Sequence, residues 1–597
     1  MKVNNTNHFG MRYEKWKILG KLTTRSNGQT EDAIINILLS NRNVVSKKDK
    51  NEFFKPKKPD DVTLKEFGVS KSEINKAIKR LTLALKRKQK VIIYGDYDAD
   101  GICATAILWE CMYKIGFDVA PYIPDRFSEG YGINSERIKN LKLKNKNLNL
   151  IVTVDNGIVA TEAVRLAHDL GIDVIITDHH TLGKEKPRAY AIVHTTEICG
   201  SGIAWLLAHE LTRKLKTPSR SASGSESSPA RGETLSDRRH NSKLITNNGL
   251  DLCAIGTIAD QMPLIGINRS FAKYGIEALR VTKRPGLIAL FEIAGVKVGL
   301  SGWQIGNYEI NYLIAPRINA MGRMENAIDS LRLICTSNKA RASELASILN
   351  RTNLERQRVV ENVVIHAREI VAKNGFGNVI IVSHASYHEG VIGLAAGRLV
   401  EEFHRPSIVI SKGEKLSKAS ARSIQGFDVI RVIKSMSKII VGGGGHPMAA
   451  GFTLKTLNIE KFKKQFERKA RTLLTADILS KRLKADLEVH LTNLKPTLFD
   501  KLEKFEPSGI GNPTPTFMSK KLNLLSVKMV GNGGKHVKLR LEARGVILDA
   551  IAFGFGDFFS DLKTGSKIDV IYNLVRNDWH NNVKMELSIR DMRINNS

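Results

Sequence analysis

Three short apolar runs, each ending close to acidic residues, constrain the fold of this chain more than any other feature. They lie at 91–94, 149–154 and 174–177, and helical patterns at 102–113 and 160–170 alternate with them. This alternation is typical of βαβ units and predicts a parallel sheet. In such sheets the chemistry gathers just beyond the carboxyl ends of the strands. The acidic residues at those ends are therefore candidates for a functional site.

The first acidic cluster follows the run at 91–94, where Asp96, Asp98 and Asp100 occupy alternate positions of YGDYDADG. Carboxylates this close repel one another unless cations neutralise them. An EF-hand loop is a poor explanation, because no glutamate stands where such a loop needs its bidentate ligand. We expect a metal site here, and a surface loop that is acidic by chance is the alternative.

Further candidate ligands come from distant segments. TVDNG supplies Asp155, ITDHH supplies Asp178, His179 and His180, and IGTIADQMPL supplies Asp260. We expect all four segments to be strand ends, so a convergent site is favoured over chance acidity. Carboxylate and imidazole ligands suit Mn²⁺ or Mg²⁺ better than zinc, which usually recruits cysteine. Two such ions can activate a water molecule and clamp a phosphate, so we expect two.

Composition narrows the classes of partner and compartment. The chain has 597 residues, with 92 Lys plus Arg against 60 Asp plus Glu and a net charge of +32, which favours a polyanionic partner over a charge that is merely solvated. The 5 cysteines form no CxxC pair, which argues against a disulfide framework and favours a reducing compartment. No stretch is long and apolar enough to cross a membrane. We therefore expect a cytoplasmic protein without a membrane partner.

The patterning predicts several domains. A Ser-, Gly- and Arg-rich stretch at 217–242 has almost no large apolar residue, which predicts a disordered insertion. The expected segments are a lead-in at 1–85, a first lobe at 86–326, a long connecting helix at 327–374, a second lobe at 375–456, and a linker with a β-barrel at 457–597.

The order of DYDAD, VDNG, DHH and ADQMPL resembles the DHH phosphoesterase superfamily, and RINAMGR and GGGGHPMAAG are similar to the RecJ family within it. The resemblance runs from about residue 15 to the C-terminus, apart from the insertion. It implies an α/β fold with two βα lobes, DHH and DHHA1, whose parallel-type sheets are joined by a long helix. It also implies a C-terminal OB-like β-barrel.

By this resemblance, five residues match metal-ligand positions: Asp98, Asp100, Asp155, His179 and Asp260. Asp155 matches the bridging carboxylate, and Asp178 and His180 complete the implied catalytic set by supporting the ligands or facing the phosphate. The chain departs from the superfamily at Tyr94, where many members have a histidine.

The glycine-rich motifs of the second lobe allow backbone to approach an anion, while arginine and histidine supply charge. The resemblance to DHHA1 implies that nine residues bind the phosphates of a nucleic acid: Arg317, Asn319, Arg323, His388, Arg398, Ser420, Arg422, Gly445 and His446. Ala419 stands where RecJ proteins usually have glycine, and its methyl group could crowd the backbone approach.

The C-terminal barrel resembles an OB-fold, which binds single strands through a basic groove and stacking aromatic side chains. The candidates for that surface are Lys535, His536, Lys538, Arg540, Phe553 and Phe555. PSGIGNPTP, at 507–515, resembles the linker motif that precedes this barrel in RecJ proteins.

The resemblance implies a single-stranded-DNA-specific 5′ to 3′ exonuclease that releases 5′-mononucleotides with two Mn²⁺ or Mg²⁺ ions and acts in recombination and repair. A helicase and a single-strand-binding protein are the implied protein partners. Two alternatives stay open: a DHH phosphodiesterase acting on short oligonucleotides, and a non-catalytic DNA-binding relative. The barrel region argues against the first, and the intact acidic motifs argue against the second.

Overall fold

The computed structural model describes residues 12–20, 31–130, 132–216, 249–300, 302–579 and 582–595, so the insertion expected at 217–242 lies outside the described residues. The chain forms two compact units. One comprises Lys55–Arg358 and Pro507–Asn512, and the other comprises Met1–Phe54, Val359–Glu506 and Pro513–Ser597.

The first lobe is built on a sheet of five strands in the order β3-β2-β4-β5-β6, and every neighbouring pair is parallel, as predicted. Their bounds are Val119–Tyr122 for β3, Lys90–Tyr94 for β2, Leu148–Val154 for β4, Asp173–Asp178 for β5 and Ala191–His194 for β6. Because all these strands run the same way, their carboxyl ends share one edge of the sheet.

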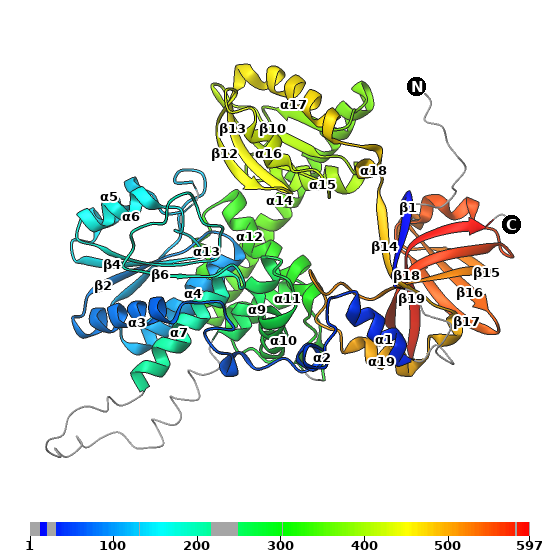
Figure 1. Ribbon diagram of the computed structural model, residues 1–597, viewed down its shortest axis with the longest axis horizontal. Helices are drawn as coiled ribbons and strands as arrows, with labels where there is room; N and C mark the ends of the chain where they lie inside the picture. Colours follow the sequence, from blue (N-terminus) through cyan, green and yellow to red (C-terminus); the bar gives the residue numbers. More distant parts are fainter. Residues whose placement is uncertain are drawn as a thin grey trace, which may run out of the picture. The chain divides into compact units, whose positions relative to one another are not determined.

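Helices cover both faces of this sheet, which is why its strands are almost continuously apolar. Val91 and Ile93 of β2 pack into a core with the helices of one face, whereas Ile92 and Tyr94 pack into a separate core with the helices of the other. The first face carries α3 (Lys71–Lys86), α4 (Ala99–Ile115), α7 (Gly200–Lys216) and α9 (Leu250–Ala259), and the second carries α5 (Ser135–Lys144) and α6 (Thr161–Asp169), as Figure 1 shows.

Further helices belong to this unit, and the last of them, α14 (Lys339–Asn374), continues past Arg358 into the other unit. The helical run expected at 327–374 is broken once, between α13 (Ile328–Cys335) and α14. Thr336 is extended there, and the Asn338 side chain accepts a hydrogen bond of 3.0 Å from the Arg341 amide. Asparagine in that position begins a new helix rather than continuing the old one. The helices are α10 (Gly266–Arg280), α11 (Pro285–Ile293), α12 (Ala315–Met324), α13 (Ile328–Cys335) and α14 (Lys339–Asn374).

The second lobe also contains a five-stranded sheet, in the order β12-β13-β11-β10-β9. Only β9 and β10 are parallel, and the other pairs are antiparallel, partly because the turn between β12 and β13 is only two residues long. The bounds are Ile440–His446 for β12, Ala449–Lys455 for β13, Leu416–Arg422 for β11, Ser407–Ser411 for β10 and Ile380–His384 for β9. Helices α16 (Val429–Lys434) and α17 (Ile459–Leu473) bury one face of this sheet, and α15 (Ile392–Phe403) contacts β10 and β11.

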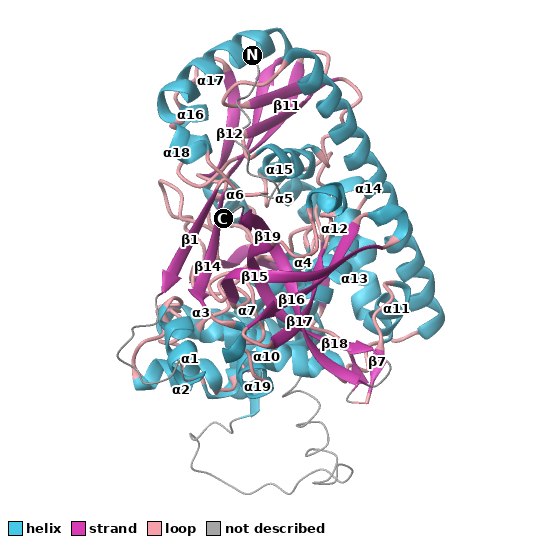
Figure 2. Ribbon diagram, turned by 90° about the vertical axis from the view of Figure 1, so that its right-hand side faces the viewer, coloured by secondary structure: helices cyan, strands magenta, loops and turns pink. Residues whose placement is uncertain are grey.

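The C-terminal region contains the expected barrel, seen as magenta strands in Figure 2. It closes because β18 pairs with β19 on one side and with β15 on the other. Its strands are β15 (Thr516–Val530), β16 (His536–Ala543), β17 (Val546–Ala552), β18 (Lys567–Trp579) and β19 (Asn582–Asn595).

The N-terminal residues join this barrel unit, whereas the sequence analysis takes 1–85 as a lead-in to the first lobe. Strand β1 (Lys15–Gly20) pairs in parallel with β14 (Arg482–Glu488), which in turn pairs with β15. Helix α1 (Glu31–Ser40) contacts α19 (Pro496–Glu503). Within the described residues, no helix combines the length and the apolar character that crossing a bilayer requires.

Candidate metal centre and nucleic-acid surface

The acidic turn after β2 leads directly into helix α4, and one of its aspartates caps that helix. The Asp98 carboxylate accepts a hydrogen bond of 3.0 Å from the Gly101 amide and caps α4, which satisfies a backbone donor at the start of that helix. The chain therefore changes from strand to helix within YGDYDADG. That change places the side chains of Asp96, Asp98 and Asp100 at the edge of the sheet where the carboxyl ends of the strands meet.

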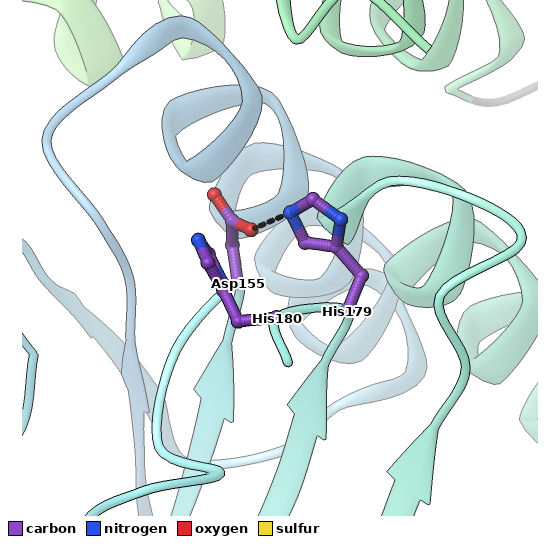
Figure 3. A group of neighbouring side chains, drawn as sticks. All are labelled: Asp155, His179 and His180. Atoms are coloured by element: carbon purple, nitrogen blue, oxygen red, sulfur yellow. Dashed lines mark ion pairs between the residues drawn. The ribbon is translucent and has the colours of Figure 1, made fainter. Parts of the chain in front are cut away.

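Seven side chains gather at this edge in three overlapping groups whose potential ligand atoms lie within 4.8 Å of one another. The groups are Asp96 with Asp98 and Asp155, Asp100 with His179 and Asp260, and Asp155 with His179 and His180. Figure 3 shows the last of them, with His179 Nε2 3.1 Å from Asp155 Oδ1. The structure thus brings together all five predicted ligands and adds Asp96 and His180.

Asp96 lies in the cluster although the predicted ligand set does not include it. Its alternate spacing with Asp98 and Asp100 is the signal in the sequence, whereas the resemblance implied only the other two aspartates as ligands. Tyr94 is fully buried, and its hydroxyl donates a hydrogen bond of 3.2 Å to the Gly132 carbonyl, away from the cluster. Its ring packs against Tyr122. The missing histidine is therefore not replaced by Tyr94, and the carboxylate of Asp96 stands in the cluster.

The carboxylate of Asp100 is oriented by the beginning of α7. The amides of Gly200 and Ser201 donate hydrogen bonds of 2.6 Å and 3.0 Å to its two oxygens. Two glycines make the room that this arrangement needs. A Cβ on Gly200 would lie 2.5 Å from Asp155 Cβ, and one on Gly256 would overlap Asp100 Oδ1 and Ser201 Oγ.

Asp178 supports the cluster through hydrogen bonds and joins none of the three groups. It accepts bonds of 2.8 Å from the Ile158 amide and 3.0 Å from the His180 amide, and its Oδ1 lies 2.8 Å from His180 Nδ1. This pairing fixes the ring of His180. Burial disfavours a charged imidazole there, but the hydrogen bond and the charge of Asp178 outweigh it and raise the pKa of His180 to about 9.

Burial and mutual repulsion disfavour the charged forms of the carboxylates in the cluster. Burial, reinforced by neighbouring carboxylates, raises the pKa of Asp96 and of Asp155 well above the usual range and raises the pKa of Asp260 to about 8. Burial lowers the pKa of His179. Such shifts mark carboxylates that lack compensating cations, and they are typical of functional sites.

Among the residues that the structure describes, the Oδ1 atom of Asp96 is buried and accepts no hydrogen bond, and the Oδ1 atom of Asp155 is buried with the His179 Nε2 atom 3.1 Å away. Asp155 also has a backbone φ of 63°, a left-handed conformation that is uncommon outside glycine. Buried acceptors without donors are costly unless a cation binds them. Oxygen donors with one or two imidazoles fit Mn²⁺ or Mg²⁺, so the residues present fit the expected ions.

Asp260 reaches the cluster from a helix, so the expectation of four strand ends is wrong at this position. It is the residue that caps the C-terminal end of α9, and His179 Nε2 lies 3.6 Å from its Oδ2. Every residue from Leu250 to Ile258 is buried. A short run that is apolar all round does not distinguish a buried strand from a buried helix, which explains the error.

Helix α12 carries RINAMGR and packs against the acidic turn. Asn319 accepts a hydrogen bond of 2.7 Å from the Ala99 amide, so its side-chain oxygen supports the turn rather than facing solvent. A Cβ on Gly322 would lie 2.5 Å from the Tyr97 carbonyl oxygen. Arg317 binds within its own unit, through the Leu313 carbonyl at 2.6 Å and Asn350 at 3.0 Å.

Two arginines lie beside the acidic turn. The charge of Arg323, a predicted site residue, acts on the Tyr97 hydroxyl. Arg126, which the sequence analysis did not single out, lies with its guanidinium 5.1 Å from the centre of the Tyr97 ring, and its charge acts on Asp96. The sequence alone does not indicate Arg126, because it lies outside the acidic motifs and only the fold brings it next to them.

The face of the second-lobe sheet opposite α16 and α17 carries three of the predicted phosphate-binding residues. Helix α15 covers part of this face, since a Cβ on Gly393 would lie 3.0 Å from Ser420 Oγ. Arg422 on β11 and His446 on β12 are both paired with Ala449 of β13, so they share one row of the sheet and one face. Ser420, two residues before Arg422, lies on the same face, and its hydroxyl accepts a bond of 3.2 Å from Arg422. Ala419 is buried in the core of the opposite face, so its methyl group does not crowd this one.

The other predicted residues of this lobe are less closely grouped. Arg398 on α15 has 57% of its side chain exposed and lies 3.9 Å from Glu361. His388 accepts a hydrogen bond of 3.1 Å from the Gly390 amide. Gly445 has a φ of 144°, and its alternate position on β12 points to the face opposite His446. Gly445 could therefore contact a phosphate only through its backbone atoms.

On the barrel, the two predicted stacking residues differ. Phe553 is 57% exposed and packs edge-on against His536, so its ring is available to a base. Phe555 is fully buried, with the guanidinium of Arg12 over its ring. The prediction for Phe555 as a stacking surface is therefore wrong, because the alternation of β17 ends before it. Lys538 and Arg540 are partly exposed on β16, where each faces an acidic side chain.

Three family models match the sequence. The DHH family, N-terminal domain, matches residues 90–257, the DHHA1 domain matches 376–472, and the RecJ OB domain matches 485–591. The first two matched regions each contain one of the five-stranded sheets, and the third covers most of the barrel.

Proteins of known sequence and structure agree with these matches. The single-stranded-DNA-specific exonuclease RecJ of Bacillus subtilis is 33% identical over 533 residues, which are 87% of this chain and 63% of that protein. The RecJ of Thermus thermophilus is 30% identical over 540 residues, 71% of its length. The crystal structure of the Thermus thermophilus protein in complex with Mn²⁺ has a TM-score of 0.78 and 27% identity, covering 98% of this chain and 80% of that one. Together with the geometry of the acidic cluster, these similarities show that the chain belongs to the RecJ family.

Proposed function

We propose that this chain is a divalent-metal-dependent exonuclease that degrades single-stranded DNA in the 5′ to 3′ direction and releases 5′-mononucleotides. The cluster of carboxylates and imidazoles carries the proposal, above all the buried carboxylates of Asp96 and Asp155. The similarity to proteins named single-stranded-DNA-specific exonucleases supports the choice of substrate. A role in recombination and repair is the corresponding biological proposal.

The proposed ligands are Asp96, Asp98, Asp100, Asp155, His179 and Asp260, and both Asp155 and His179 belong to two of the three groups. When bound, two Mn²⁺ or Mg²⁺ ions would supply Lewis-acid activation of water and would neutralise the charge at the phosphate. The chain's own residues prepare the site for this. The amides of Gly200 and Ser201 orient Asp100, and Asp178 orients His180.

The phosphates of the strand would be held by cationic side chains outside the cluster. Arg126 and Arg323 lie beside the acidic turn, and Arg422 and His446 share one face of the second-lobe sheet, with the Ser420 hydroxyl beside Arg422. Arginine suits this purpose because its planar guanidinium can donate two parallel hydrogen bonds to a phosphate. Phe553 on the barrel would stack with a base further along the strand.

Single strands arise where duplex DNA is unwound, so we propose a helicase and a single-strand-binding protein as partners, and the cytoplasm as the location. The net charge of +32 is consistent with a DNA partner.

Digestion of single strands labelled at either end tests the proposal. We expect 5′-labelled strands to release labelled mononucleotides at once, 3′-labelled strands to release them last, and duplex to resist, all only with Mn²⁺ or Mg²⁺. Equal or faster turnover of a dinucleotide than of a long strand would instead support a phosphodiesterase for short oligonucleotides. Binding without any cleavage in either metal would support a non-catalytic relative.

A further inference from the structure

The linker motif PSGIGN contributes no ligand to the metal centre, yet it lies against the turn that carries one. Residues Pro507–Asn512 belong to the same compact unit as the metal cluster, although the residues on both sides of them belong to the other unit. The segment folds into a tight turn, in which Gly509 and Asn512 exchange backbone hydrogen bonds of 2.8 Å and 3.1 Å.

Three hydrogen bonds attach this turn to the first-lobe unit. The Leu264 amide donates to the Ile510 carbonyl at 2.7 Å, the Asn307 side chain donates to the Ser508 carbonyl at 2.5 Å, and Arg269 donates to the Pro507 carbonyl at 3.1 Å. Arg269 is only 1% exposed, so its bond is formed inside the fold. Buried charged donors are costly to leave unpaired, which makes this attachment specific.

Asp260 depends on the chain segment that the linker contacts. It is the last residue of the α9 capping region, and Gln261 follows with a φ of 56°. The chain then reverses, with the Met262 amide bonded to the Thr257 carbonyl at 3.1 Å, and reaches Leu264. The Asp260 side chain is 30% exposed, whereas that of Asp155 is 2% exposed, so the protein core encloses Asp260 less than Asp155.

We infer that Pro507–Asn512 positions Asp260 for metal binding by fixing the Pro263–Leu264 end of its turn. This inference rests on the proposed role of Asp260 as a ligand. Gly509 and Gly511 are the positioning residues. A Cβ on Gly509 would lie 2.8 Å from Leu264 Cδ1, and one on Gly511, which has a φ of 75°, would lie 3.2 Å from Pro263 Cβ. Only glycine allows both the backbone conformation and this close approach.

The residue that follows this segment is also held in place. The Pro513 carbonyl accepts a hydrogen bond of 2.6 Å from Arg42 of its own unit, and β15 begins at Thr516. Buried arginines thus bind the first residue of the segment, Pro507, and the residue just after it, Pro513. Changes in this linker should therefore alter metal affinity although no atom of it is a ligand.

Calorimetric titration of Mn²⁺ into the full chain tests this inference. Gly511→Ala should weaken Mn²⁺ binding about tenfold, the scale seen when groups that orient metal ligands are lost. Gly565→Ala is the matched control, because Gly565 has a φ of 88° but nothing within 4 Å of the added methyl. It should impose similar backbone strain and leave the affinity within about twofold.

A second variant keeps the test informative if Gly511→Ala folds poorly. Asn307→Ala removes the bond to Ser508 without a backbone change, and we expect about a threefold loss of Mn²⁺ affinity and an altered Mn²⁺ spin-resonance spectrum. Unchanged affinity in folded Gly511→Ala or in Asn307→Ala, or an equal loss in Gly565→Ala, would overturn the inference while leaving the proposed function intact. Absence of Mn²⁺ binding by the unmodified chain would overturn both.

Discussion

The metal centre and the proposed phosphate-binding surface of the second lobe differ in how their side chains are packed. At the metal centre, Asp155 is 2% exposed, and the backbone at Gly200 and Gly256 lies directly against the carboxylates. On the second lobe, Arg398 of α15 is 57% exposed, and the edge strand β12 leaves Gly442 and Gly444 in open space. One region is closed and rigidly defined, and the other is open.

This difference predicts how each region responds to mutation. In a buried cluster, every ligand is required at once, so a single change should remove most of the activity. On an open cationic surface, each contact contributes separately through the charge that it neutralises, so single changes should have small effects. The following experiments test that contrast, from the largest expected effect to the smallest.

Asp155→Asn should reduce cleavage by about 10³-fold or more while strand affinity changes by less than about threefold. Asparagine keeps the shape of the side chain and tolerates the left-handed backbone, but it cannot carry the negative charge. Steady-state cleavage and fluorescence-anisotropy binding are the measurements. Asp169→Asn, at an exposed aspartate on α6, is the control. Retained cleavage in the purified Asp155→Asn variant would refute the assignment.

Gly256→Ala should weaken Mn²⁺ affinity about 10- to 100-fold, because its methyl group would displace the Asp100 carboxylate from the α7 amides. Gly202→Ala is the matched control. Its methyl group would also be crowded, at 3.2 Å from Phe271, but it would contact no ligand. Calorimetry should show the loss only in the first variant, whereas thermal unfolding should detect destabilisation in both. Equal metal affinity in the two would contradict the account.

The stability of the metal-free protein should depend on pH because of the raised pKa values in the metal centre. Burial, followed by the charge of Asp100, raises the pKa of Asp260 from 3.8 to about 8, so the metal-free folded state retains a proton that the unfolded chain has lost. That contribution to stability is present at low pH and disappears as pH rises through about 8.

The melting temperature of the metal-free protein should therefore fall between about pH 4 and 8, and Mn²⁺ affinity should rise over the same interval, up to about tenfold per pH unit. Asp260→Asn should flatten part of both curves. If the stability of the metal-free protein instead increased from about pH 4 to 8, the pKa of the buried carboxylates would not be raised as described.

Arg398→Ala should have the smallest effect, about a fivefold loss of single-strand affinity at low salt, with Mn²⁺ affinity unchanged. The slope of log affinity against log salt should become shallower by about 0.7, the value for one phosphate contact on a single strand. Arg471→Ala is the control, because Arg471 is an exposed arginine on α17, which packs on the opposite face of the sheet. A slope that does not change would remove Arg398 from the binding surface.

Much of the first lobe could be predicted because its strands are continuously apolar and end in acidic motifs. The expected runs at 149–154 and 174–177 correspond to Leu148–Val154 and Asp173–Asp178. The edge strands β3 and β6 were not singled out, because they are only 4 residues long and β3 contains a proline. Short edge strands carry little periodic signal.

Long-range features were harder to predict. Nothing in KWKILG indicates that it pairs with residues more than 450 positions away, and the direction of the glycine-rich β12 depends on a turn rather than on periodicity. The ligands could be predicted because clustered aspartates and histidines next to apolar runs are visible in the sequence itself. Arg126 and the supporting glycines were missed because their importance depends on what they touch, which only the folded structure determines.

The stoichiometry of metal binding tests the central claim most directly. Calorimetric titration of Mn²⁺ into the metal-free protein at neutral pH should show two ions bound per chain, and Asp155→Asn should weaken both, because Asp155 belongs to two of the three ligand groups. Absence of Mn²⁺ and Mg²⁺ uptake, or uptake that Asp155→Asn leaves unchanged, would contradict the account.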